Sequence, residues 1–435
     1  MLRRRMPMYL RFVVFLVASA SSLAVGMIIS KSPSEAVHFA VLPGFAAYVL
    51  LFRPDFPSKV KAYHLVYLTL LVAVVAGYMI ALTTVTPQMS VRWSELGVAM
   101  YFLLALHIVV WLIDRLVNMV LSAIFFIHRS ARRPLWKYIP KTILRVIIVI
   151  AIAVPYLTAT FMTHWVKFAD ATDPYRSLEM YYETAHFRAI DGLRLEGWFI
   201  TSVDESDATV ILVPGRGLTK ACYLDYVRLL ADNGYNVLLF DMRGEGGSDG
   251  HTRSFGVHEA NDVLGALRYL RQVHPQQSRY IFGYGISHGA AAVVSAAGAD
   301  KRIKAVVIDS PFAEPTVVLD SAIRIIPSPL RQYIRWASMI IASAELGCNL
   351  FQAGNIREIG RISPRPVLIL HGLDDKISPP TDAERLYHAA GSPKRLCEIP
   401  NAGHAQNIYL GGDEYAAEVL AVFKAVRQNR PVFRW

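Results

Sequence analysis

The stretch that decides the fold of this chain is Tyr280-Ile-Phe-Gly-Tyr-Gly-Ile-Ser-His-Gly-Ala-Ala-Ala-Val-Val294. Its first half is an apolar run that predicts a buried strand, and its small second half predicts a helix that packs closely on a sheet. Between them, Gly285 and Gly289 flank Ser287, as a sharp strand-to-helix turn requires. The pattern predicts Ser287 as a nucleophile, with the backbone N–H of His288 placed to stabilise an oxyanion.

Two competing interpretations of glycine patterns fail on context. Gly246–Gly250 also satisfies Gly-x-Ser-x-Gly, around Ser248. No strand leads directly into it and no small-residue helix follows, so it is interpreted as a glycine-rich loop. A nucleotide-binding Gly-x-Gly-x-x-Gly starting at Gly283 fails because its third glycine is replaced by His288.

Outward from the turn, from about Tyr181 onward, short β-branched runs alternate with amphipathic stretches, which is typical of a parallel sheet with crossover helices. An opening hairpin is expected from Tyr181–Ala189 and Leu193–Ile200, around Asp191-Gly192. The expected strands are Thr209–Val213, Asn236–Phe240, Tyr280–Tyr284, Ala305–Ile308, Pro366–Leu370 and Arg395–Ile399. The expected helices are Lys220–Asn233, His258–Val273, Gly289–Gly298, Thr381–Ala390 and Glu414–Gln428.

Ligands of such sheets bind at the carboxyl ends of the strands, so the residues after each strand are the candidates for chemistry. Asp375 follows the strand that ends near 370, and His404 follows the strand that ends near 399. Their order along the chain is serine, acid, histidine. We assign Ser287 as the attacking group, His404 as general base and then acid, and Asp375 as the orienting carboxylate. Asp374 and, more weakly, Asp309 stay open as alternative acids.

These motifs resemble those of the serine α/β-hydrolase superfamily, especially its membrane-associated Bem46-like and ABHD-type branch, also described as serine aminopeptidase S33-like. The resemblance covers about residues 180–430. The residues that carry it are Asp191-Gly192, Asp241-x-Arg243-Gly244-x-Gly246-x-Ser248-x-Gly250, Gly285-x-Ser287-x-Gly289, His371-Gly372-x-x-Asp375 and Gly403-His404. It implies an α/β-hydrolase fold and favours Asp375 over its neighbour as the acid.

The loop after the first parallel strand departs from this family. The family usually has His-Gly there, whereas this chain has Pro214 followed by Gly215-Arg216-Gly217. Because the glycines are retained, the resemblance still implies a backbone N–H near Arg216 as the second oxyanion donor. The implied reaction proceeds through an acyl-serine, with no metal or organic cofactor.

Length and composition indicate a second part. The 435 residues are too many for one ordinary domain, and 54% hydrophobic with 18% charged residues is more apolar than a typical soluble protein. Residues 1–165 carry 16 Lys and Arg against four acidic residues, whereas residues 166–435 carry 29 against 30. The net charge of +11 therefore belongs to the apolar part. This placement argues against a nucleic-acid partner, which needs a basic patch on a folded polar surface.

The N-terminal part contains five apolar stretches of the length that crosses a bilayer: Leu10–Ile29, Ala36–Phe52, Tyr63–Leu82, Leu96–Ile113 and Ile143–Met162. The second contains Pro43 and Gly44, so it is either a kinked span or a re-entrant segment. The predicted fold class is therefore about five N-terminal transmembrane helices followed by an α/β-hydrolase domain. The predicted domains are a membrane anchor at 1–165, a linker at 166–180 and the hydrolase at 181–435.

Basic residues predict the orientation. Thirteen of them flank the stretches on one side, and only Lys31 and Arg92 lie on the other. This bias places the N-terminus in the cytoplasm. Five crossings then place the hydrolase domain outside the cytoplasm, and the loss of the second span would reverse that side. Membrane lipids are accordingly expected as partners.

The remaining expectations concern the lid, the substrate and the cysteines. Residues 312–365 stand where a lid would be inserted, with apolar helices expected at Ile325–Pro327 and Met339–Ile341; plain scaffold helices are an equal alternative. The expected substrate is a small-molecule or lipid-like ester, thioester or amide. A catalytically silent scaffold or binding protein and a transport function for the helices are the competing classes. The three cysteines are spaced for neither a disulfide framework nor a zinc site.

Overall fold

The structure is a computed structural model that describes residues 80, 83–84, 86–91, 139–164 and 166–433. The chain divides into two compact units. One unit includes most of helices α5 (Ile139–Thr163) and α11 (Ser328–Leu346). The other contains residues 79–92, 163–327 and 346–435, and therefore every strand of the sheet described next.

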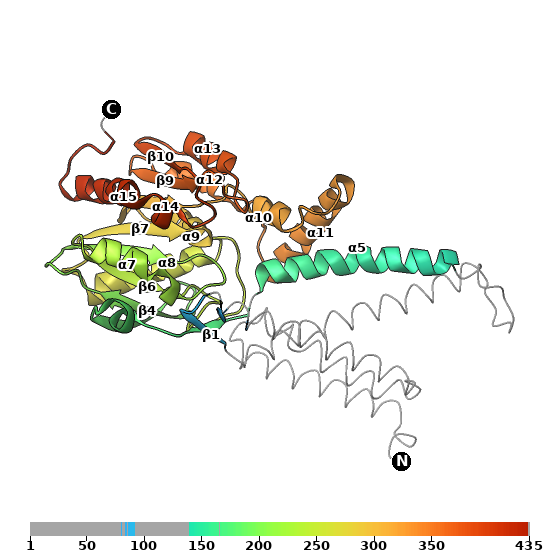
Figure 1. Ribbon diagram of the computed structural model, residues 1–435, viewed down its shortest axis with the longest axis horizontal. Coiled ribbons are helices and arrows are strands. Elements are labelled where there is room, and N and C mark those ends of the chain that lie inside the picture. The colour runs from blue at the N-terminus through green and yellow to red at the C-terminus, as the bar shows by residue number, and fades with distance from the viewer. Residues whose placement is uncertain (1–79, 81–82, 85, 92–138, 165, 434–435) are drawn as a thin grey trace, which may run out of the picture. The chain divides into compact units, whose positions relative to one another are not determined.

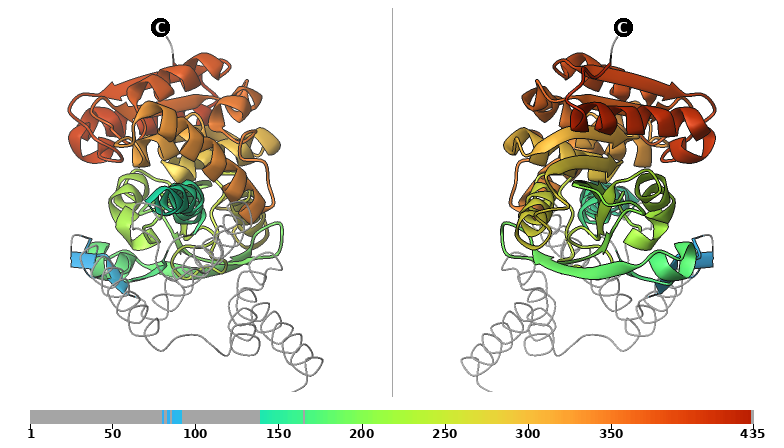
Figure 2. Two further views of the ribbon diagram at one scale, coloured as in Figure 1. Left: turned by 90° about the vertical axis from the view of Figure 1, so that its right-hand side faces the viewer. Right: turned by 90° about the vertical axis from the view of Figure 1, so that its left-hand side faces the viewer.

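The second unit contains an eight-stranded sheet in the order β10-β9-β8-β7-β5-β6-β4-β3. The strands are β3 (Tyr182–Arg188), β4 (Arg194–Ile200), β5 (Ala208–Val213), β6 (Asn236–Phe240), β7 (Tyr280–Ile286), β8 (Ile303–Asp309), β9 (Val367–Gly372) and β10 (Lys394–Ile399). The β3–β4 hairpin and the β4–β6 pair are antiparallel, and the other pairs are parallel. The predicted hairpin and all six predicted parallel strands are confirmed. The colour gradient in Figure 2 runs from the green hairpin at one edge to red β10 at the other.

Helices cover both faces of this sheet (Figure 1). One face packs against α8 (Glu259–Val273), α9 (His288–Ala299) and α13 (Pro380–Ala389), and the other against α7 (Leu224–Ala231) and α15 (Gly412–Arg427). Every residue of β5 and β6 is buried, which is why these strands are nearly continuous apolar runs. The predicted crossover helices are confirmed with small shifts at their ends; the first begins as the 3-10 helix η3 (Lys220–Tyr223).

The motif after β6 ties the opening hairpin to the rest of the sheet. Arg243 makes a two-pronged contact with Asp191 in the hairpin turn, at 2.8 and 3.0 Å. Its guanidinium also contacts Asp262 of α8, at 2.9 and 2.6 Å. Planar guanidinium groups suit such paired carboxylate contacts. The arginine of the motif thus has a structural task.

The predicted transmembrane helices are contradicted. Among the described residues, no helix combines the length and the apolar character needed to cross a bilayer. The first four predicted stretches lie outside those residues apart from Ile80, and the fifth, Ile143–Met162, falls on α5. There α5 is one partner of a helix pair with polar contacts. Ser338 of α11 donates to the Pro155 carbonyl at 3.1 Å, and Thr160 donates to Glu345 at 3.2 Å.

Two other segments differ in detail from the expectations. Residues 166–180 contain β2 (Phe168–Asp170), which pairs with β1 (Met89–Val91), and the short helix α6 (Pro174–Leu178). Residues 312–365 contain α10 (Pro315–Ala322), α11, α12 (Asn355–Glu358) and η4 (Ile359–Ile362). The expectation of a helix at Ile325–Pro327 is wrong, because this stretch lies in the turn between α10 and α11. The one expected at Met339–Ile341 lies within α11.

Candidate active site

Ser287 occupies the sharp turn between β7 and α9. Its backbone φ of 53° and ψ of −110° are uncommon for a residue other than glycine. The backbone N–H of Ser287 donates to the Asp309 carbonyl at 2.8 Å, which fixes the turn to β8. A β-carbon on Gly285 would lie 2.4 Å from the Gly289 carbonyl oxygen. The close approach of the turn to the helix therefore leaves no room for a side chain at position 285.

Asp375 lies in the turn after β9 and is buried. Its Oδ1 accepts hydrogen bonds from the backbone N–H groups of Ile377 and Ser378, at 2.8 and 2.9 Å. Its Oδ2 lies 2.7 Å from His404 Nδ1. Two backbone donors orient the carboxylate so that one oxygen faces the histidine.

His404 follows β10 and bridges the other two residues. Its Nε2 lies 2.7 Å from Ser287 Oγ, and its Nδ1 contacts Asp375 on the opposite edge of the ring. The backbone after it is held by Ser310, whose hydroxyl accepts from the Ala405 N–H at 3.0 Å. The structure thus brings together the three residues that sequence order pointed to, although 117 positions separate the histidine from the serine. A nucleophile, a base and an orienting acid in contact are the geometry of nucleophilic catalysis.

The alternative acids have other contacts. Asp374 is exposed, and its backbone N–H donates to the Ala402 carbonyl at 2.9 Å. Asp309 is buried and accepts hydrogen bonds from Tyr415 at 2.6 Å and Asn407 at 2.7 Å. Burial raises the pKa of Asp309. The carboxylate that accepts the hydrogen bond of His404 Nδ1 is that of Asp375, so neither alternative occupies the orienting position.

The two predicted oxyanion residues come from two elements that approach the serine. His288 is the first residue of α9, and Arg216 lies in the loop after β5. A β-carbon on Gly215 would lie 3.5 Å from Ser287 Cβ, so this loop runs directly beside the nucleophile. A β-carbon on Gly289 would lie 2.2 Å from the Val213 carbonyl oxygen, so α9 presses against the same strand end. Donation by the two backbone N–H groups stays a prediction.

The side chain of His288 has surroundings that sequence reasoning missed. It is buried, stacks on Phe255 with ring centres 5.5 Å apart, and has its Nε2 3.5 Å from Glu259 Oε1. Glu259 also accepts the Ser254 N–H and hydroxyl, both at 2.7 Å. Burial raises the pKa of Glu259, but the His288 ring, the Arg243 guanidinium and the Ser254 hydroxyl outweigh it and hold that pKa well below its usual range. No local sequence pattern marks Glu259, because its partner histidine is 29 residues away.

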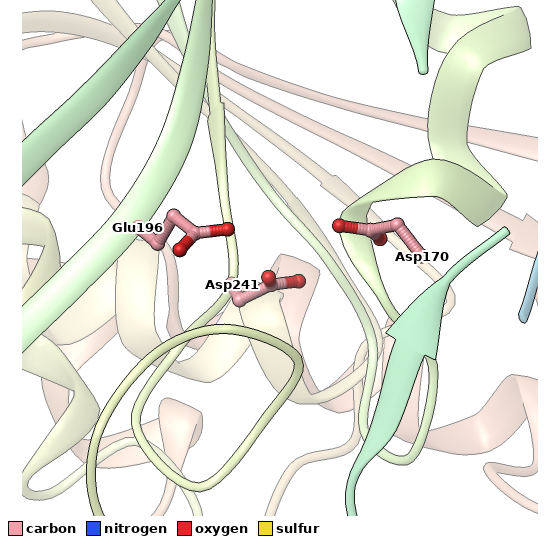
Figure 3. A group of neighbouring side chains, drawn as sticks. All are labelled: Asp170, Glu196 and Asp241. Atoms are coloured by element: carbon pink, nitrogen blue, oxygen red, sulfur yellow. The ribbon is translucent and has the colours of Figure 1, made fainter. Parts of the chain in front are cut away.

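A second cluster that was missed lies near the loop after β5. The carboxylates of Asp170, Glu196 and Asp241 converge, as Figure 3 shows. Three such carboxylates suit a divalent cation. Here the buried Lys220 ammonium lies 2.6 Å from Asp170, 2.7 Å from Asp241 and 3.2 Å from Glu196. Burial alone would lower the pKa of Lys220, but Asp241 and Asp170 raise it overall. The lysine therefore supplies the positive charge that a metal ion would bring.

Comparisons with known proteins agree with this fold. Residues 204–355 match the family described as serine aminopeptidase, S33. The Escherichia coli (strain K12) protein YfhR is 30% identical over 282 residues, covering 62% of this chain and 89% of that protein. The Arabidopsis thaliana alpha/beta hydrolase domain-containing protein WAV2 is 27% identical over 249 residues, covering 55% and 77%. Among solved structures, the Pyrococcus furiosus esterase Pf2001 superposes with a TM-score of 0.50 at 22% identity, over 59% of this chain and 97% of that one.

Proposed function

Because the chain belongs to the α/β-hydrolase superfamily and is a serine hydrolase, we propose that Ser287, His404 and Asp375 form the triad through which it cleaves an ester, thioester or amide bond. The observation that carries the proposal is the His404 ring, which contacts the serine hydroxyl with one nitrogen and the buried carboxylate with the other, each at 2.7 Å. This contact pattern fixes the tautomer in which Nε2 can accept a proton.

The proposed reaction has two halves. Ser287 Oγ attacks the acyl carbon while His404 Nε2 takes the hydroxyl proton, and the same nitrogen then protonates the leaving group as its bond to the acyl carbon breaks. Water next attacks the acyl-serine, gives its proton to Nε2, and releases the acid as Oγ recovers that proton. Asp375 stays ionised throughout and stabilises the imidazolium. In both halves the N–H groups of His288 and Arg216 would stabilise the oxyanion.

We further propose a small-molecule or lipid-like acyl group as the substrate. The support is the apolar surface within residues 312–365 of the unit that holds the triad, where Ile325 and Phe351 are exposed. A panel of 4-nitrophenyl esters with two to sixteen acyl carbons would test it. A rate that rises with chain length is expected, and a preference for acetate alone would contradict a lipid-like acyl group. The predicted Bem46-like branch, the lid, the membrane-lipid partners and the extracytoplasmic placement stay predictions.

Fluorophosphonate labelling of the full-length chain tests the triad. We expect the wild type to be labelled and Ser287→Ala to be unlabelled. Ser248→Ala is the matched control, since Ser248 sits in the other Gly-x-Ser-x-Gly and its hydroxyl donates to the Asp241 carbonyl. This control should keep its label. A folded wild type without label would favour a silent binding protein, and label retained in Ser287→Ala would assign the chemistry to another serine.

A further inference from the structure

Residues 214–217, in the loop between β5 and η3, are held from both sides by buried side chains. Tyr223 Oη accepts the Gly215 N–H at 2.7 Å, and Glu245 Oε1 accepts the Gly217 N–H at 2.9 Å. These two hydrogen bonds flank Arg216. Pro214, at the start of the loop, has no N–H to donate. The loop that runs beside the nucleophile is therefore anchored by side chains that come from elsewhere in the fold.

The tyrosine is well placed to act as an anchor. Tyr223 is only 4% exposed, and its backbone ends η3. That short helix is itself fixed, because the Lys220 N–H donates to Asp241 Oδ1 at 2.8 Å and the Lys220 ammonium contacts three carboxylates. Burial raises the pKa of Tyr223, so the group stays a neutral hydroxyl that accepts through a lone pair. The hydroxyl is thus rigidly positioned.

The anchored peptide lies between the tyrosine and the nucleophile. A β-carbon on Gly215 would lie 2.8 Å from Tyr223 Oη and 3.5 Å from Ser287 Cβ. The peptide unit after Gly215 carries the Arg216 N–H, so a rotation of the glycine would turn that N–H relative to the serine. Oxyanion donors act within a few tenths of an ångström of their best position, and a misplacement of about 1 Å costs about 100-fold in rate.

We propose that Tyr223 is a positioning residue for the oxyanion hole: by accepting the Gly215 N–H, its hydroxyl holds the loop so that the Arg216 N–H faces the substrate carbonyl oxygen. Glu245 holds the other end of the same loop through Gly217. The inference rests on the proposed serine hydrolase function. It concerns how the oxyanion donor is held and assigns no proton transfer to the tyrosine.

The test compares Tyr223→Phe with Tyr226→Phe. Both tyrosines are buried, at 4% and 2% exposure, and they are neighbours in the fold with ring centres 5.8 Å apart. The Tyr226 hydroxyl has no hydrogen-bond partner among the described residues, so its removal is a matched control. With 4-nitrophenyl butyrate as the probe, we expect Tyr223→Phe to lower kcat by about 10- to 100-fold with KM changed less than about twofold. Tyr226→Phe should keep both constants within about twofold.

A transition-state analogue separates positioning from general damage to the fold. Binding of a trifluoromethyl ketone should weaken in Tyr223→Phe by the same factor as kcat/KM, at an unchanged fraction of folded protein. Equal, small effects of both substitutions would overturn the inference, as would a Tyr223→Phe loss found only in KM. A wild type that neither labels nor turns over would instead count against the proposed function itself.

Amide hydrogen exchange in the wild type gives an answer even if Tyr223→Phe does not fold. The Gly215 amide should exchange far more slowly than an exposed loop amide, because its N–H is bonded to a buried hydroxyl. Exchange at the rate of an exposed loop would overturn the anchoring role. Slow exchange in the wild type that becomes fast in a folded Tyr223→Phe would support it directly.

Discussion

At the scale of single residues, the two oxygens of Asp375 have different tasks. One is occupied by the backbone N–H groups of Ile377 and Ser378, and the other contacts His404. The turn after β9 therefore dictates which oxygen the imidazole meets. The backbone N–H groups donate to one oxygen, and His404 Nδ1 lies against the other. The site therefore requires an acceptor at both positions and is poorly suited to the NH₂ group of an amide.

This asymmetry predicts opposite outcomes for two adjacent aspartates. Asp375→Asn should lower kcat by about 10³- to 10⁴-fold, because an asparagine NH₂ must face either the backbone donors or the Nδ1–H. Asp374→Asn, at the exposed neighbouring position, should stay within about twofold. Steady-state hydrolysis of 4-nitrophenyl butyrate measures both. A large loss in Asp374→Asn with an active Asp375→Asn would exchange their roles.

The residue scale also shows where prediction from sequence stops. Ser287, His404 and Asp375 are predictable because each follows a recognisable strand, and parallel strands bring their carboxyl ends to one edge of the sheet. Tyr223 and Glu259 are not predictable in this way. Their partners, Gly215 and His288, become neighbours only through packing, and a buried tyrosine or glutamate has no signature of its own in the sequence.

At the scale of elements, α9 approaches β5 so closely that backbone meets backbone. A β-carbon on Gly289 would lie 2.2 Å from the Val213 carbonyl oxygen and 2.5 Å from that of Pro214. Farther along α9 the space is larger, since a β-carbon on Gly298 would meet nothing nearer than 3.6 Å. Position 289 therefore has no room for a side chain, whereas position 298 has room for one.

Substituting each glycine by alanine should reveal this difference in available space. Gly289→Ala must push the oxyanion loop or the helix aside, and we expect a loss of about 1–3 kcal/mol in the free energy of unfolding and at least a tenfold slower fluorophosphonate labelling. Gly298→Ala should leave labelling unchanged and raise stability by up to about 1 kcal/mol through helix propensity. Urea denaturation and labelling rates check both. Equal effects of the two would contradict a local steric cause.

Element prediction worked where one pattern dominates. β6 has the predicted bounds Asn236–Phe240, because the turns on both sides of this fully buried run mark where the strand begins and ends. β2 was missed because three residues, Phe168–Asp170, form a strand only by pairing with Met89–Val91 far away in the chain. The helix expected at Ile325–Pro327 failed because apolar character alone does not tell a helix from a turn that ends before a proline.

At the scale of the whole molecule, buried carboxylates couple stability to pH. The pKa of Glu259 is held well below its usual range, because the His288 ring, the Arg243 guanidinium and the Ser254 hydroxyl outweigh the effect of burial. Its ionised form therefore stabilises the native state at pH values above the ordinary glutamate pKa of about 4.3. That contribution is lost as the pH falls below this value toward the lowered native pKa.

Replacing this carboxylate should flatten the acid side of the stability curve. Glu259→Gln should lose about 1–3 kcal/mol at pH 7, because an amide NH₂ would face the Ser254 and Gly256 N–H donors. The difference from wild type should shrink as the pH falls from about 5 to 3. Urea midpoints followed by tryptophan fluorescence measure it, with exposed Glu384→Gln as control. A constant difference across this pH range would exclude Glu259 as the titrating group.

The architecture of the whole chain was predicted unevenly. Alternation of strands and helices is a local signal repeated many times, so the α/β unit followed from sequence. The N-terminal expectation rested on hydropathy and on the segregation of basic residues, and among the described residues no helix meets the requirements of a membrane span. Hydropathy cannot distinguish a lipid partner from a protein partner, as the polar contacts between α5 and α11 illustrate.

The backbone conformation of Ser287 has an evolutionary consequence. A φ of 53° suits glycine better than any other residue, so a glycine at this position would relieve about 1–2 kcal/mol while removing the nucleophile. Selection for stability alone would favour that exchange, and only selection for turnover opposes it. A descendant lineage that no longer needs hydrolysis would therefore be expected to exchange this serine for glycine. The resulting inactive protein would be more stable than the enzyme.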